Sequence, residues 1–128
     1  MGKDERSKRS SVGRLKRRAD FLRVAALRRK WAAPGLILQA APQPESETPE
    51  AEIRVGFTAS RKVGNAVKRN RARRRLKALV REMIATDADP GMDLVLIARP
   101  ATVDRPFDEL RRDLLQSLQR TKAARKIH

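Results

Sequence analysis

The chain has 128 residues and a formal net charge of +16 at pH 7, from 31 Lys and Arg residues against 15 Asp and Glu. Its apolar content of 40% favours one folded domain over a disordered polycation. It has no Cys, which excludes disulfides and thiolate metal sites, and no apolar run near the roughly 20 residues of a membrane span. A folded body this positive predicts a polyanionic partner. We expect nucleic acid in a reducing, cytoplasmic setting, and no membrane.

The first half of the chain predicts a helix and a strand before an acidic loop. Residues 1–13 are polar and basic without periodicity, so we expect a flexible basic N-terminal tail. Apolar residues at helical spacing predict a helix over residues 20–29. Residues 31–40 follow as a strand, which an internal Pro-Gly pair places at an edge or a bulge. Residues 41–52 hold three prolines and four glutamates, and we expect this loop to join two neighbouring strands of a hairpin.

The second half predicts strand, helix, strand and helix. Alternation over residues 53–58 indicates a half-buried strand. A helix begins at Asn65 or Ala66, with Asn65 as a suitable N-cap, and runs to about residue 85. The nearly continuous apolar run at 92–98 is typical of a strand covered on both faces. A last helix is expected from about residue 105 to residue 120.

Together these elements define a single domain over residues 14–120, followed by a basic C-terminal tail over residues 121–128. Their order is α-β-β-β-α-β-α, in which the third strand is the least defined by the pattern. Amphipathic helices and strands in this order indicate an α+β fold. We expect the helices to pack against one sheet as a two-layer α/β sandwich.

The segment from Ile53 to Arg81 contains eleven Lys and Arg residues and no acidic residue. On a helical projection, part of this charge falls within an arc of roughly 100°, opposite the apolar stripe. The arc contains Asn70, Arg73, Arg74, Lys77 and Arg81, and a flanking row contains Lys68, Arg71 and Arg75. An ordinary solvated helix face is the alternative, but such faces mix the two signs because like charges at i,i+4 repel. The pattern therefore favours a polyanion-binding face.

RNA is the favoured polyanion. Guanidinium groups bind phosphates with two donors and also stack on exposed bases of irregular RNA. The sequence has no helix-turn-helix spacing, no zinc-finger ligand set and no basic zipper heptad.

The residues that carry this charge also form a recognisable motif. Residues 61–74, RKVGNAVKRNRARR, resemble the signature of the bacterial ribonuclease P protein subunit, which contains Arg-Asn-Arg followed by a further basic pair. Residues 14–16, the Asp20-Phe21 pair, the strand at 54–60 and the late strand that ends at residues 98–100 match as well, so the resemblance covers about residues 14–120. The alternative for such a chain is a ribosomal protein or RNA chaperone of similar charge, and the Arg-Asn-Arg motif favours the ribonuclease P family.

The resemblance implies more than the residues themselves show. The family fold is similar to domain 2 of ribosomal protein S5 and has a left-handed βαβ crossover. Family members bind the catalytic ribonuclease P RNA and the 5′ leader of precursor tRNA, and they assist removal of that leader. The RNA performs the hydrolysis with Mg²⁺, which is bound mainly by the RNA, so no catalytic or metal-binding residue and no protein partner is expected here.

The resemblance and the cationic face together predict these RNA-binding residues: Arg61, Lys62, Lys68, Arg69, Asn70, Arg71, Arg73, Arg74, Lys77 and Arg81. Asn70 either orients neighbouring groups or binds RNA directly. Phe21 is the candidate wall of the leader cleft, with an ordinary core role as the equal alternative, and Phe57 is expected in the core.

Three positions depart from aromatic residues that are common in the family's cleft, namely Ala25, Leu36 and Gln39. Because stacking on an aromatic is worth about 1–3 kcal/mol per base, we expect leader contacts here to depend more on charge and shape. At position 77, where Arg is common in the family, Lys keeps the positive charge but lacks the two parallel N–H donors with which Arg binds a phosphate.

A self-sufficient nuclease is disfavoured. The chain has one His, at position 128, and the hydroxyls of Thr58 and Ser60 have no candidate base. The acids at 82, 87, 89 and 93 bracket a helix end and a turn, where we expect solvation.

Overall fold

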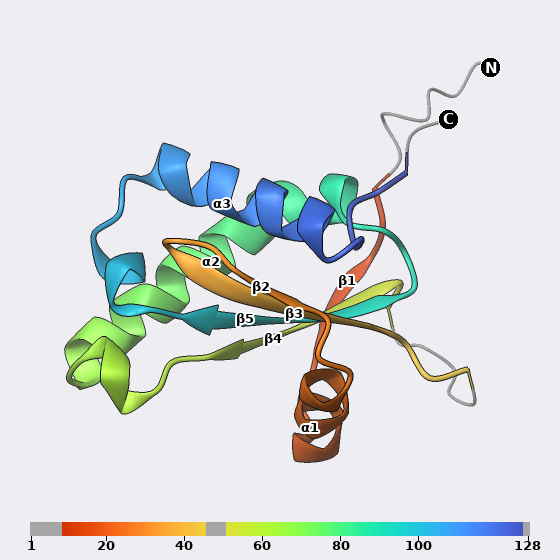
Figure 1. Ribbon diagram of the computed structural model, residues 1–128, viewed down its shortest axis with the longest axis horizontal. Helices are drawn as coiled ribbons and strands as arrows, with labels where there is room; N and C mark the ends of the chain where they lie inside the picture. The colour runs from red at the N-terminus through yellow and green to blue at the C-terminus, as the bar shows by residue number, and fades with distance from the viewer. Residues whose placement is uncertain (1–8, 46–50, 127–128) are drawn as a thin grey trace.

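The computed structural model describes residues 9–45 and 51–126, and we refer to its elements by the labels in Figure 1. In chain order they are β1 (Val12–Arg14), α1 (Arg18–Ala26), β2 (Lys30–Ala32), β3 (Leu36–Pro42), β4 (Ile53–Thr58), the 3₁₀ helix η2 (Arg61–Val63), α2 (Ala66–Asp87), β5 (Met92–Ala98), the 3₁₀ helix η3 (Pro100–Val103) and α3 (Phe107–Arg120). The expected α+β class is confirmed. The expected acidic loop falls partly on residues 46–50, which lie outside the described ranges, as do residues 1–8 and 127–128.

The five strands form one mixed sheet in the order β1-β4-β5-β3-β2. β4 pairs in parallel with both β1 and β5, whereas β3 pairs antiparallel with β5 and β2. Helix α2 makes the crossover between the parallel strands β4 and β5. The expectation that the acidic loop joins neighbouring strands is wrong, because β5, which comes later in the chain, lies between β3 and β4.

The helices cover both faces of the sheet (Figure 1). α2 and α3 lie on one face, over a large core that includes Leu38, Leu76 and Leu114. α1 lies on the opposite face, over a smaller core of Leu15, Val24, Ala41 and Val95. The expected two-layer packing therefore describes α2, α3 and the sheet, and α1 adds a third layer, because β5 is apolar on both faces and needs cover on both.

Several elements lie where the sequence pattern predicts them. The strands at 53–58 and 92–98 are confirmed. Helix α2 begins at Ala66, and the Asn65 side chain caps it by accepting a hydrogen bond from Lys68 N at 3.0 Å. The first helix runs over Arg18–Ala26 rather than residues 20–29, so Asp20 lies within its first turn.

Residues 31–40 form two strands rather than one. β2 and β3 are a hairpin, and Ala33 N donates to Leu36 O at 2.9 Å across its turn. Gly35 N donates to Asp113 Oδ2 of α3 at 3.0 Å, and a Cβ at Gly35 would lie 2.5 Å from that oxygen. The Pro-Gly pair therefore ends β2 and lets the turn lie directly on α3.

The two terminal segments are shorter than expected. The strand β1 pairs in parallel with β4 from Val12 onward, so a tail ending at residue 13 is wrong. At the other end, Thr121 and Ala123 are buried, and Arg125 N donates to Asp87 O at 2.7 Å, so the segment expected as a basic tail is packed on the domain as far as Arg125. Both segments gain order only from backbone partners that are distant in sequence, which periodicity does not reveal.

Candidate RNA-binding interface

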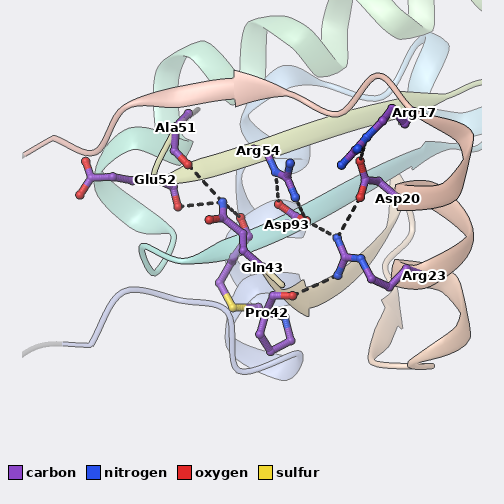
Figure 2. A network of polar contacts seen from close by, with 10 residues as sticks. Arg17, Asp20, Arg23, Pro42, Gln43, Ala51, Glu52, Arg54 and Asp93 are labelled. Carbon is purple, nitrogen blue, oxygen red and sulfur yellow. Dashed lines mark hydrogen bonds and ion pairs between the residues drawn. The ribbon is translucent and has the colours of Figure 1, made fainter. Parts of the chain in front are cut away.

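Helix α1 is held on the sheet by a chain of alternating charges (Figure 2). Arg17 Nε donates to Asp20 Oδ2 at 3.1 Å, and Arg23 Nη2 lies 3.5 Å from Asp20 Oδ1. Arg23 also donates to the carboxylate of Asp93 on β5 and to the carbonyl of Pro42 at 3.1 Å. Because both carboxylates are buried, the Arg23 guanidinium fixes α1 to β3 and β5.

Asp93 is the centre of this network, and its side chain is completely buried. Arg54 on β4 donates from Nε to Oδ1 at 2.8 Å and from Nη2 to Oδ2 at 2.7 Å. The two residues are register partners in the parallel β4–β5 pair, so the strands set this two-bond geometry. A solvated turn position for Asp93 and a half-buried alternation for β4 were both expected, and both are wrong because each charge is buried against the other.

The ring of Phe21 lies on the backbone of Gly56 in β4. A Cβ at position 56 would lie 2.5 Å from Phe21 Cζ and 3.3 Å from Leu15 Cβ, so only glycine admits the ring in this position. The ring packs against the smaller core and remains partly exposed. The structure therefore gives Phe21 a core contact together with an accessible side.

The face that carries α1 is only partly covered. Ile97 of β5 pairs with Ile37 of β3 and with Thr58 of β4, and all three residues are partly exposed. Gln39 lies on this face as well, whereas Leu36 is fully buried in the large core on the other face. The replacement of an aromatic at Leu36 therefore has no bearing on the α1 face, and the replacement at Gln39 does.

The predicted RNA-binding residues lie on η2 and on α2 between Lys68 and Arg81. Seven of them are exposed: Arg61, Lys62, Lys68, Asn70, Arg71, Arg74 and Arg81. Arg69, Arg73 and Lys77 are partly buried. Within residues 9–45 and 51–126, the single ion pair of this set joins Arg71 Nε to Asp104 Oδ1 at 3.9 Å. The remaining cations of the set have no carboxylate partner in these ranges.

Short contacts order part of this surface. Asn70 Oδ1 accepts a hydrogen bond from Arg73 Nη1 at 3.0 Å, so Asn70 orients a neighbouring cation. Lys77 Nζ lies 6.0 Å from the centroid of the Phe57 ring, which packs against the large core as expected. A guanidinium has five N–H donors, so one internal bond leaves Arg73 able to bind a phosphate.

Two arginines of the flanking row are bonded to η3 and its flanking turn. Arg71 Nε donates to Val103 O at 2.9 Å, and Arg75 Nη1 donates to Thr102 O at 2.7 Å. Burial, and secondly the nearby Arg71 cation, lowers the pKa of the Arg75 guanidinium. The Arg75 side chain also lies over the Phe107 ring, 5.9 Å from its centroid. The sequence pattern groups Lys68, Arg71 and Arg75 in one basic row. In the structure Arg71 and Arg75 bond to backbone carbonyls of η3, which lies against this side of α2, whereas the Lys68 side chain is exposed.

Two further features, a metal-binding cluster and a membrane-spanning helix, are absent from the described part of the chain. The described residues contain no group of three or more His, Cys, Asp or Glu side chains arranged to hold a metal ion. In the same part of the chain, no helix has the length and apolarity needed to cross a membrane.

Comparison with known proteins agrees with this geometry. The sequence profile of the family described as Ribonuclease P matches residues 10–122. A ribonuclease P protein component from Paramagnetospirillum magneticum is 57% identical over 117 residues, covering 91% of this chain and 88% of the relative. One from Gluconacetobacter diazotrophicus is 48% identical, covering 84% of this chain and 89% of the relative.

Solved structures share the fold. The ribonuclease P protein of Staphylococcus aureus superposes with a TM-score of 0.68 at 24% identity, covering 86% of this chain and 95% of that one. The corresponding Thermotoga maritima protein gives a TM-score of 0.66 at 23% identity, covering 80% and 92%. The profile match spans β1 through the end of α3, including η2, the cationic helix and the charge network beneath α1, and the chain therefore belongs to the ribonuclease P protein family.

Proposed function

We propose that this chain binds ribonuclease P RNA through η2 and the exposed cationic arc of α2. The observation that carries the proposal is the absence, among the described residues, of carboxylate partners for Arg73, Arg74 and Lys77 on one side of one helix. Such uncompensated charge costs stability in the isolated protein and is offset when phosphates approach. The arc is anchored on its other side by the apolar stripe of α2 and by the bonds of Arg71 and Arg75 to backbone carbonyls.

We further propose that the α1 face receives the single-stranded 5′ leader of precursor tRNA. Phe21 offers a partly open ring, and Ile37, Thr58 and Ile97 offer partly exposed side chains beside it. The buried network of Asp93 holds α1, and therefore the ring, in a fixed position relative to the strands. With Ala25 and Gln39 in place of aromatics, Phe21 is the residue available for stacking, and the rest of the contact is polar or aliphatic.

The protein acts as the non-catalytic subunit in this proposal. Its role is to bind and position two RNA molecules, and the RNA subunit with Mg²⁺ supplies the hydrolysis that frees the tRNA 5′ end. The described residues do not provide a fitting set of Mg²⁺ ligands, so no step is assigned to a metal held by this chain. A ribosomal protein or RNA chaperone, the alternative, is not favoured by the family comparison.

The direct test is cleavage of precursor tRNA by the cognate RNA alone, the protein alone, and both together, across a Mg²⁺ titration. We expect the protein to lower the Mg²⁺ concentration needed by the RNA and to show no cleavage by itself. Arg112→Gln is a suitable control, because Arg112 is an exposed cation on α3, outside the arc. Leader cleavage by protein freed of RNA, or an unchanged Mg²⁺ requirement, would contradict the proposal.

A further inference from the structure

A second cationic surface lies at the β2 edge of the sheet, away from the α2 arc. Residues 21–44 contain no Asp or Glu, and neither do residues 114–128. The fold brings these two acid-free segments together, because the C-terminal part of α3 packs over β3 and the edge strand β2. α2 packs instead over β4 and β5, so β3 separates the two basic surfaces across the sheet.

An arginine and a tryptophan form the centre of this second surface. The guanidinium carbon of Arg120 lies 4.9 Å from the centroid of the Trp31 ring, in cation–π geometry. Trp31 is partly exposed and Arg120 is exposed. The pairing holds the ring and the guanidinium plane together at the surface. Both groups are ones on which an unpaired base can stack.

The backbone around this pair is tied together by a third arginine. Arg29 donates from Nε to Thr121 O at 2.6 Å and from Nη2 to Lys122 O at 2.9 Å, which joins the start of β2 to the C-terminal end of α3. Arg28 and Lys122 have φ angles of 62° and 61°, and they are the two non-glycine residues with positive φ in the described ranges. Both positions, where glycine would be less strained, carry an exposed cation instead.

The exposed cations of this surface have no ion-pair partner among the described residues. They are Arg28, Arg120 and Lys122. The acids of α3 lie in its N-terminal half, and Asp113 and Glu109 are paired with Arg105. The second surface therefore combines unpaired positive charge with an aromatic ring.

We propose that this surface, formed by Arg28, Arg29, Trp31, Arg120 and Lys122, is a second binding site for single-stranded RNA. The phosphates lie against the cations and one base stacks on the exposed part of Trp31 beside Arg120. The proposal extends the function proposed above, since it takes the protein to be an RNA-binding subunit, but it rests on different residues.

The chain contains one Trp and no Tyr, so intrinsic fluorescence reports on Trp31 alone. The experiment is a titration of the full-length protein with a short fluorescein-labelled oligouridylate, followed both by anisotropy and by Trp31 emission. We expect binding to quench the emission, and we expect Trp31→Leu to weaken binding by about fivefold or more while Trp31→Phe retains most of it. Arg120→Gln with Lys122→Gln should weaken binding and flatten the log–log salt dependence by roughly 0.7 per lost phosphate contact.

Matched variants separate this site from the α2 arc and from a general charge effect. Arg112→Gln removes one exposed α3 cation outside the surface and should bind like the wild type. Arg73→Gln with Arg74→Gln should weaken assembly with ribonuclease P RNA while Trp31 quenching by the oligonucleotide persists. Circular dichroism melting checks that each variant is folded, and the Arg120 and Lys122 variant leaves the ring itself in place.

Two outcomes would overturn the proposal. One is RNA binding seen by anisotropy with Trp31 emission unchanged at saturation and with normal affinity in the Arg120 and Lys122 variant. The other is a blue shift of Trp31 emission with phosphatidylglycerol vesicles but no response to RNA, which would assign the surface to a membrane. Normal assembly with ribonuclease P RNA in the Arg73 and Arg74 variant, with Trp31 quenching intact, would contradict only the function proposed above.

Discussion

Arg54 and Asp93 form a buried two-bond ion pair across the parallel strands β4 and β5, with donor–acceptor distances of 2.8 and 2.7 Å. Asp93 also accepts from Arg23, so a single carboxylate connects two strands to α1. Two guanidinium groups on one buried carboxylate make this position sensitive to small changes. Removing the negative charge removes the ion pairs that Asp93 makes with the buried Arg54 and with Arg23.

We therefore expect Asp93→Asn, which keeps the shape, to lower the free energy of unfolding by about 3–5 kcal/mol. Urea denaturation followed by circular dichroism measures the loss. Asp108→Asn is the control, because the Asp108 carboxylate is largely exposed and its pair with Arg111 is on the surface, so little change is expected. Equal effects from the two substitutions would show that the buried network does not determine stability.

Gly56→Ala tests the contact between the strand and Phe21. The new Cβ would lie 2.5 Å from the Phe21 ring, and such overpacking typically costs about 1–3 kcal/mol. Phe21→Leu in the same chain should relieve part of that cost, which a double-mutant cycle measures as a coupling energy. If the ring also contacts the leader, Gly56→Ala should reduce affinity for leader-bearing tRNA more than for mature tRNA. If the effects of Gly56→Ala and Phe21→Leu on the free energy of unfolding are strictly additive, the Phe21 ring moves away from position 56 at no cost.

Substitutions of the neighbouring arginines Arg74 and Arg75 on α2 should affect different properties, RNA binding for Arg74 and stability for Arg75. Arg75 donates to Thr102 O and to Arg105 O at 2.5 Å, so Arg75→Gln should lower the melting temperature. Arg74 is exposed and has no carboxylate partner among the described residues, so Arg74→Gln should not lower the melting temperature but should weaken RNA binding. In the Arg73→Ala, Arg74→Ala double variant, the log–log salt slope for RNA binding should flatten by roughly 0.7–0.9 per lost contact. An unchanged slope would remove these two residues from the interface.

The link between α2 and α3 predicts a defined acid sensitivity. A hydrogen bond from Arg111, together with its positive charge, lowers the pKa of Glu82 from its usual 4.5, while desolvation acts in the opposite direction. Since the folded-state pKa lies below the unfolded value, this contribution is complete above pH 4.5 and is lost as the pH falls through the lowered pKa. The stability difference between wild type and Glu82→Gln should therefore shrink below about pH 4.5. A difference that stays constant from neutral pH to pH 3 would contradict this, and Arg111→Gln should abolish the pH dependence of the difference.

The sequence pattern correctly predicted the elements that depend on contacts between residues close together in the chain. Asn65 caps α2 where an N-cap was expected, because the capping bond spans three residues. The continuous apolar run of β5 indicated cover on both faces, and the structure places α1 on one and α2 on the other. β1 was missed because its three residues are ordered by pairing with β4, some forty positions later.

The amino-acid sequence by itself determined the charge, the cationic arc of α2 and the family to which the chain belongs, since these depend on residue type and helical spacing alone. Only the tertiary structure decided which charges are available. It buries Asp93 between Arg54 and Arg23 and bonds Arg71 and Arg75 to the backbone around η3. It also brings Trp31 and Arg120 together from opposite ends of the chain. These pairings depend on strand order and register, which follow from packing of the whole domain rather than from any local segment.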